Sequence, residues 1–294
     1  MALMVAAMFV VPWMDAIAKH LAQSLAPAQV TWGRFLFQTL LLLPLMLVGG
    51  RPVWDGRLGL HAARGVMMAL AILCLVWGLK YLPLANAIAI FFVEPLILTL
   101  FGLLFLGESV GWRRLLAVAV GLGGALVVIR PNWALFGWAA VLPLGTAVFF
   151  AGYLALTRHM AVTGDAVVLQ FWAGLFGALV LTATQLAGAA GVESLAPAWP
   201  SPVQWLLMVA MGALSILGHM LIAHAFRRAS AGILAPFQYM EIISATALGL
   251  LLFGDFPDAM TLAGTAVIIG SGLYVFHRER KVAHRPVAVP DEAV

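Results

Sequence analysis

Two glutamates, Glu94 and Glu241, lie 147 residues apart within long apolar stretches of this sequence. Each lies ten residues into its stretch, which places it near mid-membrane if the stretch spans a bilayer. An ionisable side chain at such a depth normally faces a cavity, a partner or water, because exposure to lipid is costly. One carboxylate could therefore receive a substrate ammonium or a proton. Alternatively, both could be structural, hydrogen-bonding each other or the backbone freed by helix breaks near Pro95 and Pro236.

A second charged group lies in the first two apolar stretches. Asp15 and Lys19 are four residues apart, so they can pair on one face of a helix. Arg34 lies at a similar depth in the next stretch. The sequence predicts a three-member ion cluster, either as a gate that exchanges partners or as a pair that lets the helix carry charge in lipid.

Phe91 and Gln238 lie at helical spacing from Glu94 and Glu241 and are further candidates for a cavity lining, together with aromatic residues and a histidine on stretches expected to border the cavity. A stacked ring adds about 0.5–1.5 kcal/mol for an aromatic substrate, but the ten tryptophans also fit an interfacial belt. His219 could titrate near neutral pH or simply be a satisfied buried histidine. The predicted lining is Trp77, Phe91, Tyr153, His219, Gln238 and Tyr239.

Four prolines inside apolar stretches predict helix bends at Pro12, Pro95, Pro143 and Pro236. Bent helices around a central cavity are typical of moving gates, although helix packing alone also tolerates them.

The residue patterns of catalytic and metal sites are missing. The sequence contains no HExxH, no GxSxG and no phosphate-binding GxxxxGK(S/T) motif. His219 and His224 are five residues apart and point about 140° from each other on a helix. Cys74 is the single cysteine. We therefore expect no enzyme, no cofactor and no metal site.

The composition excludes an ordinary soluble domain, since 64% of the residues are hydrophobic, 10% are charged, and the mean hydropathy is +1.04. Apolar runs of the length that spans a bilayer recur along the chain. The predicted spans are residues 2–22, 28–48, 60–82, 84–107, 112–130, 135–156, 166–190, 203–227, 231–254 and 259–277.

The chain also repeats itself. Residues 102–108 read GLLFLGE and residues 249–255 read GLLLFGD, and the same shift relates Glu94 to Glu241. Each copy holds five spans, so the second copy must enter the membrane from the opposite side. The expected fold is an all-α polytopic membrane protein of two inverted five-helix repeats around a central cavity, which is typical of secondary transporters. The expected units are residues 1–130, residues 135–277 and a disordered tail, residues 278–294.

Small residues mark the fifth and tenth spans as scaffold. Ala117, Gly121 and Ala125 recur at four-residue spacing, and Gly264 and Gly270 lie in the matching span. Such stripes let helices approach closely, as scaffold or as oligomer contacts.

The basic residues fix the expected orientation. With a cytoplasmic N-terminus, twelve of the sixteen Lys and Arg, Arg64 among them, lie at the cytoplasmic ends and three at the opposite ends. Both termini are therefore expected in the cytoplasm. The net charge of +4 reflects topology and predicts no nucleic-acid partner.

Four features carry a resemblance to a known family: the two five-span halves, the Asp15–Lys19 stretch, Arg34, and the Gly-Glu and Gly-Asp endings of the fourth and ninth spans. Through these features residues 1–277 resemble the ten-helix EamA branch of the drug/metabolite transporter superfamily. Within it, the chain is most similar to YddG-type bacterial aromatic amino-acid exporters. The resemblance implies a basket of ten helices, with a cavity lined mainly by spans 1, 3, 4, 6, 8 and 9. It also implies export of amino acids and related metabolites.

The leading hypothesis is a secondary exporter in the bacterial inner membrane that prefers aromatic or hydrophobic amino acids and works by alternating access. Its expected partners are a small-molecule substrate and the lipid bilayer, with the protein a monomer or weak dimer. An alternative cargo is another small metabolite, nucleoside-like, or a cationic drug. A non-transporting membrane scaffold is the third alternative.

Overall fold

The computed structural model describes residues 1–48, 56–105, 111–160, 165–192, 196–229 and 231–283. Within these ranges the protein consists of helices and connecting segments, with no strand. The helices are α1 (Ala2–Ala22), α2 (Pro27–Val48), α3 (Leu58–Leu79), α4 (Leu84–Phe91), α5 (Glu94–Phe105), α6 (Trp112–Phe136), the 3₁₀ turn η1 (Gly137–Val141), α7 (Leu142–Met160), α8 (Ala166–Ala189), α9 (Pro202–Phe226), α10 (Ala231–Gln238), α11 (Met240–Leu248), the π-helical turn η3 (Gly249–Phe253) and α12 (Ala259–Ala283).

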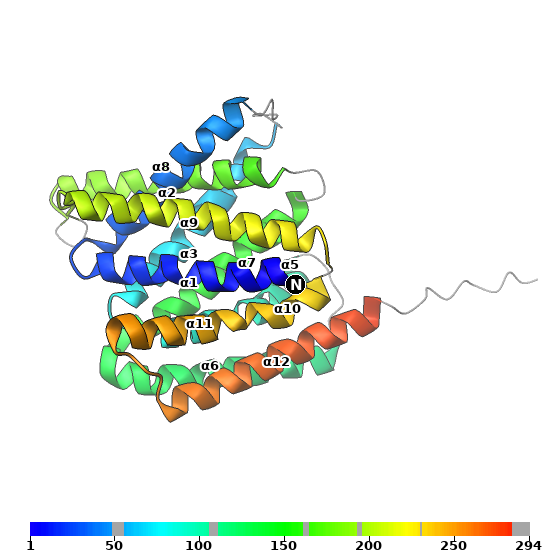
Figure 1. The fold of residues 1–294 in the computed structure, drawn as a ribbon. Helices are drawn as coiled ribbons and strands as arrows, with labels where there is room; N and C mark the ends of the chain where they lie inside the picture. The colour runs from blue at the N-terminus through cyan, green and yellow to red at the C-terminus, as the bar shows by residue number, and fades with distance from the viewer. Residues whose placement is uncertain (49–55, 106–110, 161–164, 193–195, 230, 284–294) are drawn as a thin grey trace, which may run out of the picture.

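Ten of these segments are long and apolar enough to cross a membrane, as the sequence predicts. Two spans are broken: α4 and α5 together make the fourth, and α10, α11 and η3 make the ninth. The helices lie side by side as a bundle (Figure 1). α1 begins and α12 ends at the same end of this bundle, as an even number of crossings requires.

The packing of the helices follows a pseudo-twofold relation between the two halves. Equivalent spans pack against each other in the pairs α2–α8, α6–α12 and α4–α11. Other contacts also occur as matched pairs, since α1 packs on α9 as α7 packs on α3, and α1 packs on α11 as α7 packs on α5. Each half contains five crossings, so the two halves are inverted relative to each other.

The breaks in the fourth and ninth spans lie at equivalent positions and meet at the centre. Phe92 follows α4 and Tyr239 follows α10, and their ring centroids are 5.1 Å apart. Pro95 has no N–H to donate to the Phe91 carbonyl, which accounts for the break before α5. Pro236 lies inside α10, three residues before the second break.

Pro12 and Pro143, the other two predicted helix bends, differ in their effect on the helix. α1 continues through Pro12 from Ala2 to Ala22 without interruption. Pro143 is the second residue of α7, directly after the 3₁₀ turn η1. It therefore lies in the first turn of a helix, where the missing N–H breaks no helical hydrogen bond.

The fifth and tenth spans cross closely through glycine. A Cβ atom built on Gly264 would lie 2.7 Å from the Gly124 carbonyl oxygen, and one on Gly124 would lie 3.0 Å from the Gly264 carbonyl oxygen. A Cβ on the neighbouring Gly123 meets no atom within 4 Å. The close α6–α12 crossing therefore depends on Gly124 and Gly264, and Gly121 likewise faces Ser271 of α12 too closely for a Cβ, whereas Gly123 is open.

This crossing gives a stability prediction. Gly264→Ala should destabilise the protein by about 1–3 kcal/mol, because the new methyl group forces two backbones apart. Gly123→Ala should be neutral or stabilising by up to about 1 kcal/mol, since alanine is the better helix former and the site is open. Thermal unfolding in detergent measures both. Equal melting temperatures for the two variants would contradict the close crossing.

Candidate functional site

A cavity lies at the centre of the bundle, between the two broken spans and the helices that surround them. Its volume is about 130 Å³. The first, third, fourth, sixth, eighth and ninth spans contribute to the lining, and Arg34 adds the second span. The lining residues are Met8, Val11, Met14, Asp15, Arg34, Met68, Ile72, Leu75, Ile88, Phe91, Phe92, Glu94, Pro95, Thr146, Phe150, His219, Ile222, Gln238 and Glu241.

Three carboxyl groups and one guanidinium line this cavity. Asp15, Glu94 and Glu241 are 4%, 9% and 7% exposed, and Arg34 is 1% exposed. A buried charge is stable only when an opposite charge or hydrogen bonds compensate it. With one arginine for three acids, the cavity has a surplus of acidic groups that protons or a bound cation can neutralise.

The helix breaks position the two glutamates. Glu94 is the first residue of α5, and Glu241 is the second residue of α11. The N-terminal turn of a helix carries a partial positive charge that stabilises a carboxylate. The breaks thus place both acids where a continuous helix would supply no such dipole.

Arg34 is held by a polar network that crosses from α2 to two helices of the second half. Its Nη2 donates to Ser215 Oγ at 3.2 Å, and Ser215 Oγ donates to Gln38 Oε1 at 2.9 Å. Gln38 Nε2 donates in turn to the Gln170 carbonyl oxygen at 3.0 Å. The Arg34 Nε atom is buried without a hydrogen-bond partner. This guanidinium therefore keeps donor capacity for an acceptor group.

Of the predicted lining residues, Glu94, Glu241, Phe91, His219 and Gln238 line the cavity. The Nδ1 atom of His219 lies 2.7 Å from the carbonyl oxygen of Ser215, one helical turn earlier. This contact orients the ring on the cavity wall.

Two aromatic residues that the sequence analysis did not single out also line the cavity. Phe150 makes an edge contact with Phe91, with ring centroids 5.4 Å apart, and the Phe92 ring centroid lies 5.8 Å from that of Phe91. Phe92 follows the fourth span's break, and Phe150 lies on the sixth span. Both are phenylalanines in long apolar runs, so their spacing alone did not distinguish them from packing residues.

Three predicted lining residues are absent from the lining, because each packs elsewhere. Trp77 makes an edge contact with Trp138 at 6.0 Å. Tyr153 is buried against Arg64. Tyr239 packs on Phe92 from behind the cavity wall, where a Cβ on Gly272 would overlap its hydroxyl.

Arg64, one of the basic residues assigned to the cytoplasmic span ends, is buried inside the bundle and is no solvent-facing end residue. It is 0% exposed. Its Nε donates to Thr157 Oγ1 at 2.9 Å, and its Nη2 donates to the Tyr153 hydroxyl at 3.3 Å. Arg64 lies six residues after the start of α3, and at this position its side chain packs between α3 and α7.

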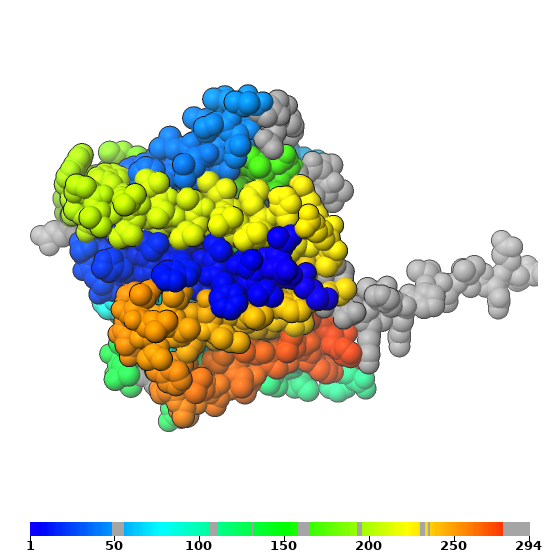
Figure 2. Space-filling view, in the orientation of Figure 1, coloured from blue at the N-terminus to red at the C-terminus, as the bar shows by residue number. Residues whose placement is uncertain are grey.

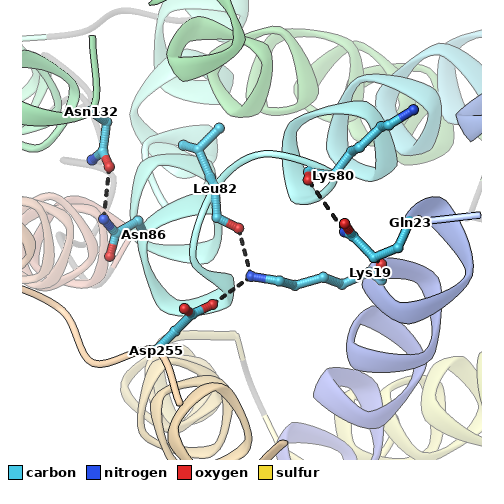
Figure 3. Close-up of polar contacts among 7 residues, drawn as sticks. All are labelled: Lys19, Gln23, Lys80, Leu82, Asn86, Asn132 and Asp255. Carbon is cyan, nitrogen blue, oxygen red and sulfur yellow. Dashed lines mark hydrogen bonds and ion pairs between the residues drawn. The ribbon is translucent and has the colours of Figure 1, made fainter. Parts of the chain in front are cut away.

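The predicted ion cluster of Asp15, Lys19 and Arg34 is also wrong in its pairing. Lys19 Nζ contacts Asp255 Oδ2 at 2.6 Å and donates to the Leu82 carbonyl oxygen at 2.9 Å (Figure 3). Asp15 and Arg34 line the cavity instead. The reason is that the α11–α12 connection, distant in sequence, brings a second acid to Lys19.

The glycine of the repeated Gly-Asp motif positions this second acid. Gly254 has φ +70°, a left-handed conformation that favours glycine, and it ends the π-helical turn. The Asp255 N–H then donates to the Gly249 carbonyl oxygen at 3.1 Å. The turn directs the Asp255 carboxylate toward α1. The corresponding Gly107 and Glu108 of the first repeat lie outside the described residues.

Neighbouring contacts tie the same end of the bundle together. Gln23 Nε2 donates to the Lys80 carbonyl oxygen at 3.2 Å, which joins the ends of α1 and α3. Asn86 Nδ2 donates to Asn132 Oδ1 at 2.9 Å, which joins α4 to α6. We call the Lys19–Asp255–Leu82 contact the latch. In Figure 2, α1 lies between α9 and the segment that carries the latch acid.

No group of three or more His, Cys, Asp or Glu side chains suited to a metal ion occurs in the part of the chain that the structure describes.

Comparison with known proteins identifies the class. The model of the EamA-like transporter family matches residues 1–130 and again residues 137–276. The chain therefore belongs to the EamA-like transporter family, and it is a membrane transporter and not an enzyme. A crystal structure of a protein of 18% sequence identity superposes with a TM-score of 0.65, covering 95% of this chain and 98% of the other, which shows the same fold.

Individual relatives carry different cargoes. The chain is 30% identical to the pseudopaline exporter CntI of Pseudomonas aeruginosa strain UCBPP-PA14, over 91% of this chain and 92% of that protein. It is 24% identical to the S-adenosylmethionine uptake transporter of Rickettsia bellii, over 93% and 91%. It is 29% identical to the riboflavin transporter of Rhizobium johnstonii, over 86% and 80%. These relatives support the family, but they do not support the narrower likeness to YddG-type aromatic amino-acid exporters.

The latch gives a prediction about access to the cavity. In a Cys74→Ala background with Ile88→Cys on the cavity wall, Asp255→Asn should speed thiol labelling about two- to fivefold. That factor corresponds to loss of a partly exposed ion pair of up to about 1 kcal/mol, which favours the closed bundle. A membrane-impermeant maleimide measures the rate.

Asp258→Asn is the matched control. Asp258 lies in the same connection but accepts from the Thr261 N–H and does not contact Lys19. Equal labelling rates in both variants would exclude the latch as a closure of the cavity.

Proposed function

We propose that this protein is a secondary transporter of small metabolites that carry an ammonium or other cationic group next to an apolar or aromatic part. The observation that carries the proposal is the central cavity, where Asp15, Glu94 and Glu241 face a single arginine among apolar and aromatic side chains. An ammonium neutralises part of the acidic surplus, and Arg34 provides a donor for a carboxylate. A zwitterionic head group fits both.

The size of the cavity and the symmetry of the fold support transport by alternating access. Pockets that bind small molecules measure about 300–1,000 Å³, and this cavity measures about 130 Å³. The described conformation is therefore too closed for such a substrate. We propose that the two inverted halves, residues 1–130 and 135–277, rock or bend at the paired helix breaks to admit it from each side in turn.

We propose export from the cytoplasm, with both termini cytoplasmic in a bacterial inner membrane. The excess of basic residues at one set of span ends supports this orientation. The name of the relative CntI, an exporter, supports the direction. An uptake transporter is also among the relatives, so transport in the opposite direction is the outcome that would overturn this part.

Aromatic amino acids are a second candidate cargo, and one feature of the cavity favours them. Phe91, Phe92 and Phe150 form a connected aromatic wall beside the carboxyl groups. Offset or edge-on stacking of a substrate ring on this wall would add about 0.5–1.5 kcal/mol per ring. The amino group and the ring of phenylalanine or tyrosine could then be bound together.

Competition in proteoliposomes of purified protein separates these cargoes. The experiment measures efflux of labelled phenylalanine in the presence of unlabelled competitors. If phenylalanine is not carried, labelled S-adenosylmethionine replaces it. We expect cationic and zwitterionic metabolites to compete and neutral riboflavin to fail. Transport of none of them would remove the proposed substrate class, and transport of riboflavin alone would remove the requirement for a cation.

The glutamates give the next prediction. Glu94→Gln and Glu241→Gln should each lower transport about 10- to 100-fold, because each removes a charge-assisted contact to the cation or the proton that balances the cavity. Initial rates of efflux from proteoliposomes measure the loss. Asp258→Asn, which changes an acid outside the cavity, should transport normally. Normal transport by both glutamine variants would exclude the two glutamates from the mechanism.

Arg34 gives a prediction about selectivity. Arg34→Gln should raise KM for phenylalanine about tenfold, but leave the inhibition constant of 2-phenylethylamine, which has no carboxylate, nearly unchanged. Arg64→Gln is the control, since Arg64 is a buried arginine outside the cavity lining. If Arg34→Gln affected both compounds equally, Arg34 would have a structural role and no contact with the carboxylate.

A further inference from the structure

A second hollow lies on the outside of the bundle, between the fifth and tenth spans. Its volume is about 420 Å³. It is lined by eight residues at the start of α6 and toward the end of α12: Trp112, Arg113, Leu116, Ala117, Val120, Gly270, Ser271 and Tyr274. We call it the α6–α12 groove.

The groove lies on the outer side of the α6–α12 contact, where the exposed faces of the two helices leave a furrow, although the helices stay packed beneath it at Gly121 and Ser271. Near Gly124 and Gly264 the two backbones nearly touch. Six residues further along α12, a Cβ on Gly270 would meet no atom within 4 Å. The groove is therefore a gap in the membrane-facing surface, away from the central cavity, and none of its lining residues belongs to the transport site.

The chemistry of the lining changes along the helix axis. Trp112 is 68% exposed and Tyr274 is 42% exposed, so two amphipathic rings frame the end of the groove. Arg113 is exposed and lies over the Trp112 ring, 5.5 Å from its centroid. Leu116, Ala117, Val120 and Gly270 make the deeper part apolar. Trp and Tyr at this position are typical of the level of the lipid head groups.

The charge at this end is positive. None of the eight lining residues is acidic. Arg278 follows Tyr274 by one helical turn on the same face of α12. The first-turn N–H groups of α6 add the positive end of a helix dipole beside Arg113. A ligand with an anionic head and an apolar chain complements this sequence of surfaces.

We propose that the α6–α12 groove binds one anionic phospholipid, with the phosphate at Arg113 and an acyl chain along Leu116, Val120 and Gly270. The lipid covers the furrow between the exposed faces of α6 and α12 and so stabilises their packing. This site is independent of the transported substrate, because its lining shares no residue with the central cavity.

Native mass spectrometry of the full chain in detergent tests the proposal, with phosphatidylglycerol and phosphatidylcholine of the same acyl chains as probes. The wild type should retain phosphatidylglycerol in preference to phosphatidylcholine and gain melting temperature with it. Arg113→Ala should lower this retention about fivefold, the factor expected for one basic contact to an anionic lipid. Arg130→Ala removes an exposed arginine at the other end of α6 and should bind like the wild type.

Gly270→Leu separates lipid binding from folding. Leucine fills the groove without meeting an atom at its Cβ, and it is a better helix former than glycine. This variant should lose phosphatidylglycerol while melting no lower than the lipid-free wild type. The proposal is overturned if Gly270→Leu and Arg113→Ala retain the lipid like the wild type, or if phosphatidylcholine binds as well as phosphatidylglycerol. It is also overturned if a second copy of this chain occupies the groove, which a dimer that Gly270→Leu abolishes would show.

Discussion

Charge in a low-dielectric interior is the constraint on which this structure depends. An ionisable side chain in a membrane span must face a partner, a cavity or water. Asp15, Glu94, Glu241 and Arg34 share the central cavity, Lys19 reaches Asp255, and Arg64 donates to two hydroxyl groups. The ten spans of this EamA-like transporter are arranged so that none of these groups has to face lipid.

The internal repeat brings the two glutamates together at the centre of the bundle. Phe92 and Tyr239 are equivalent residues at equivalent helix breaks, and they pack on each other where the two halves meet. Each break starts a new helix whose first turn carries a glutamate. In the proposed mechanism the two breaks, which lie in contact, bend together, and this bending links the position of the acids to the change of access. The latch adds an ion pair at one end only among the described residues, so the two ends of the pseudo-symmetric bundle are chemically different.

The two hollows of the molecule are lined by different helices. The central cavity gathers charge from the first, second, fourth and ninth spans, whereas the fifth and tenth spans have no ionisable residue in their interior and cross through glycine. On the exposed side of that helix pair, arginine and aromatic residues at the head-group level border an apolar groove. The cavity thus suits a small polar solute, and the groove suits an amphipathic lipid that stays in place.

The sequence alone determined the spans, the repeat, the family and the positions of Glu94 and Glu241, because span length and mid-membrane charge depend on local composition and on an internal match. It could not determine partners. The pairing of Lys19 with Asp255, separated by 236 residues, the burial of Arg64 and the aromatic wall of Phe91, Phe92 and Phe150 depend on which helix faces which. In an apolar chain both lipid and protein accept the same side chains, so the helix rotations are decided only when the ten spans pack together.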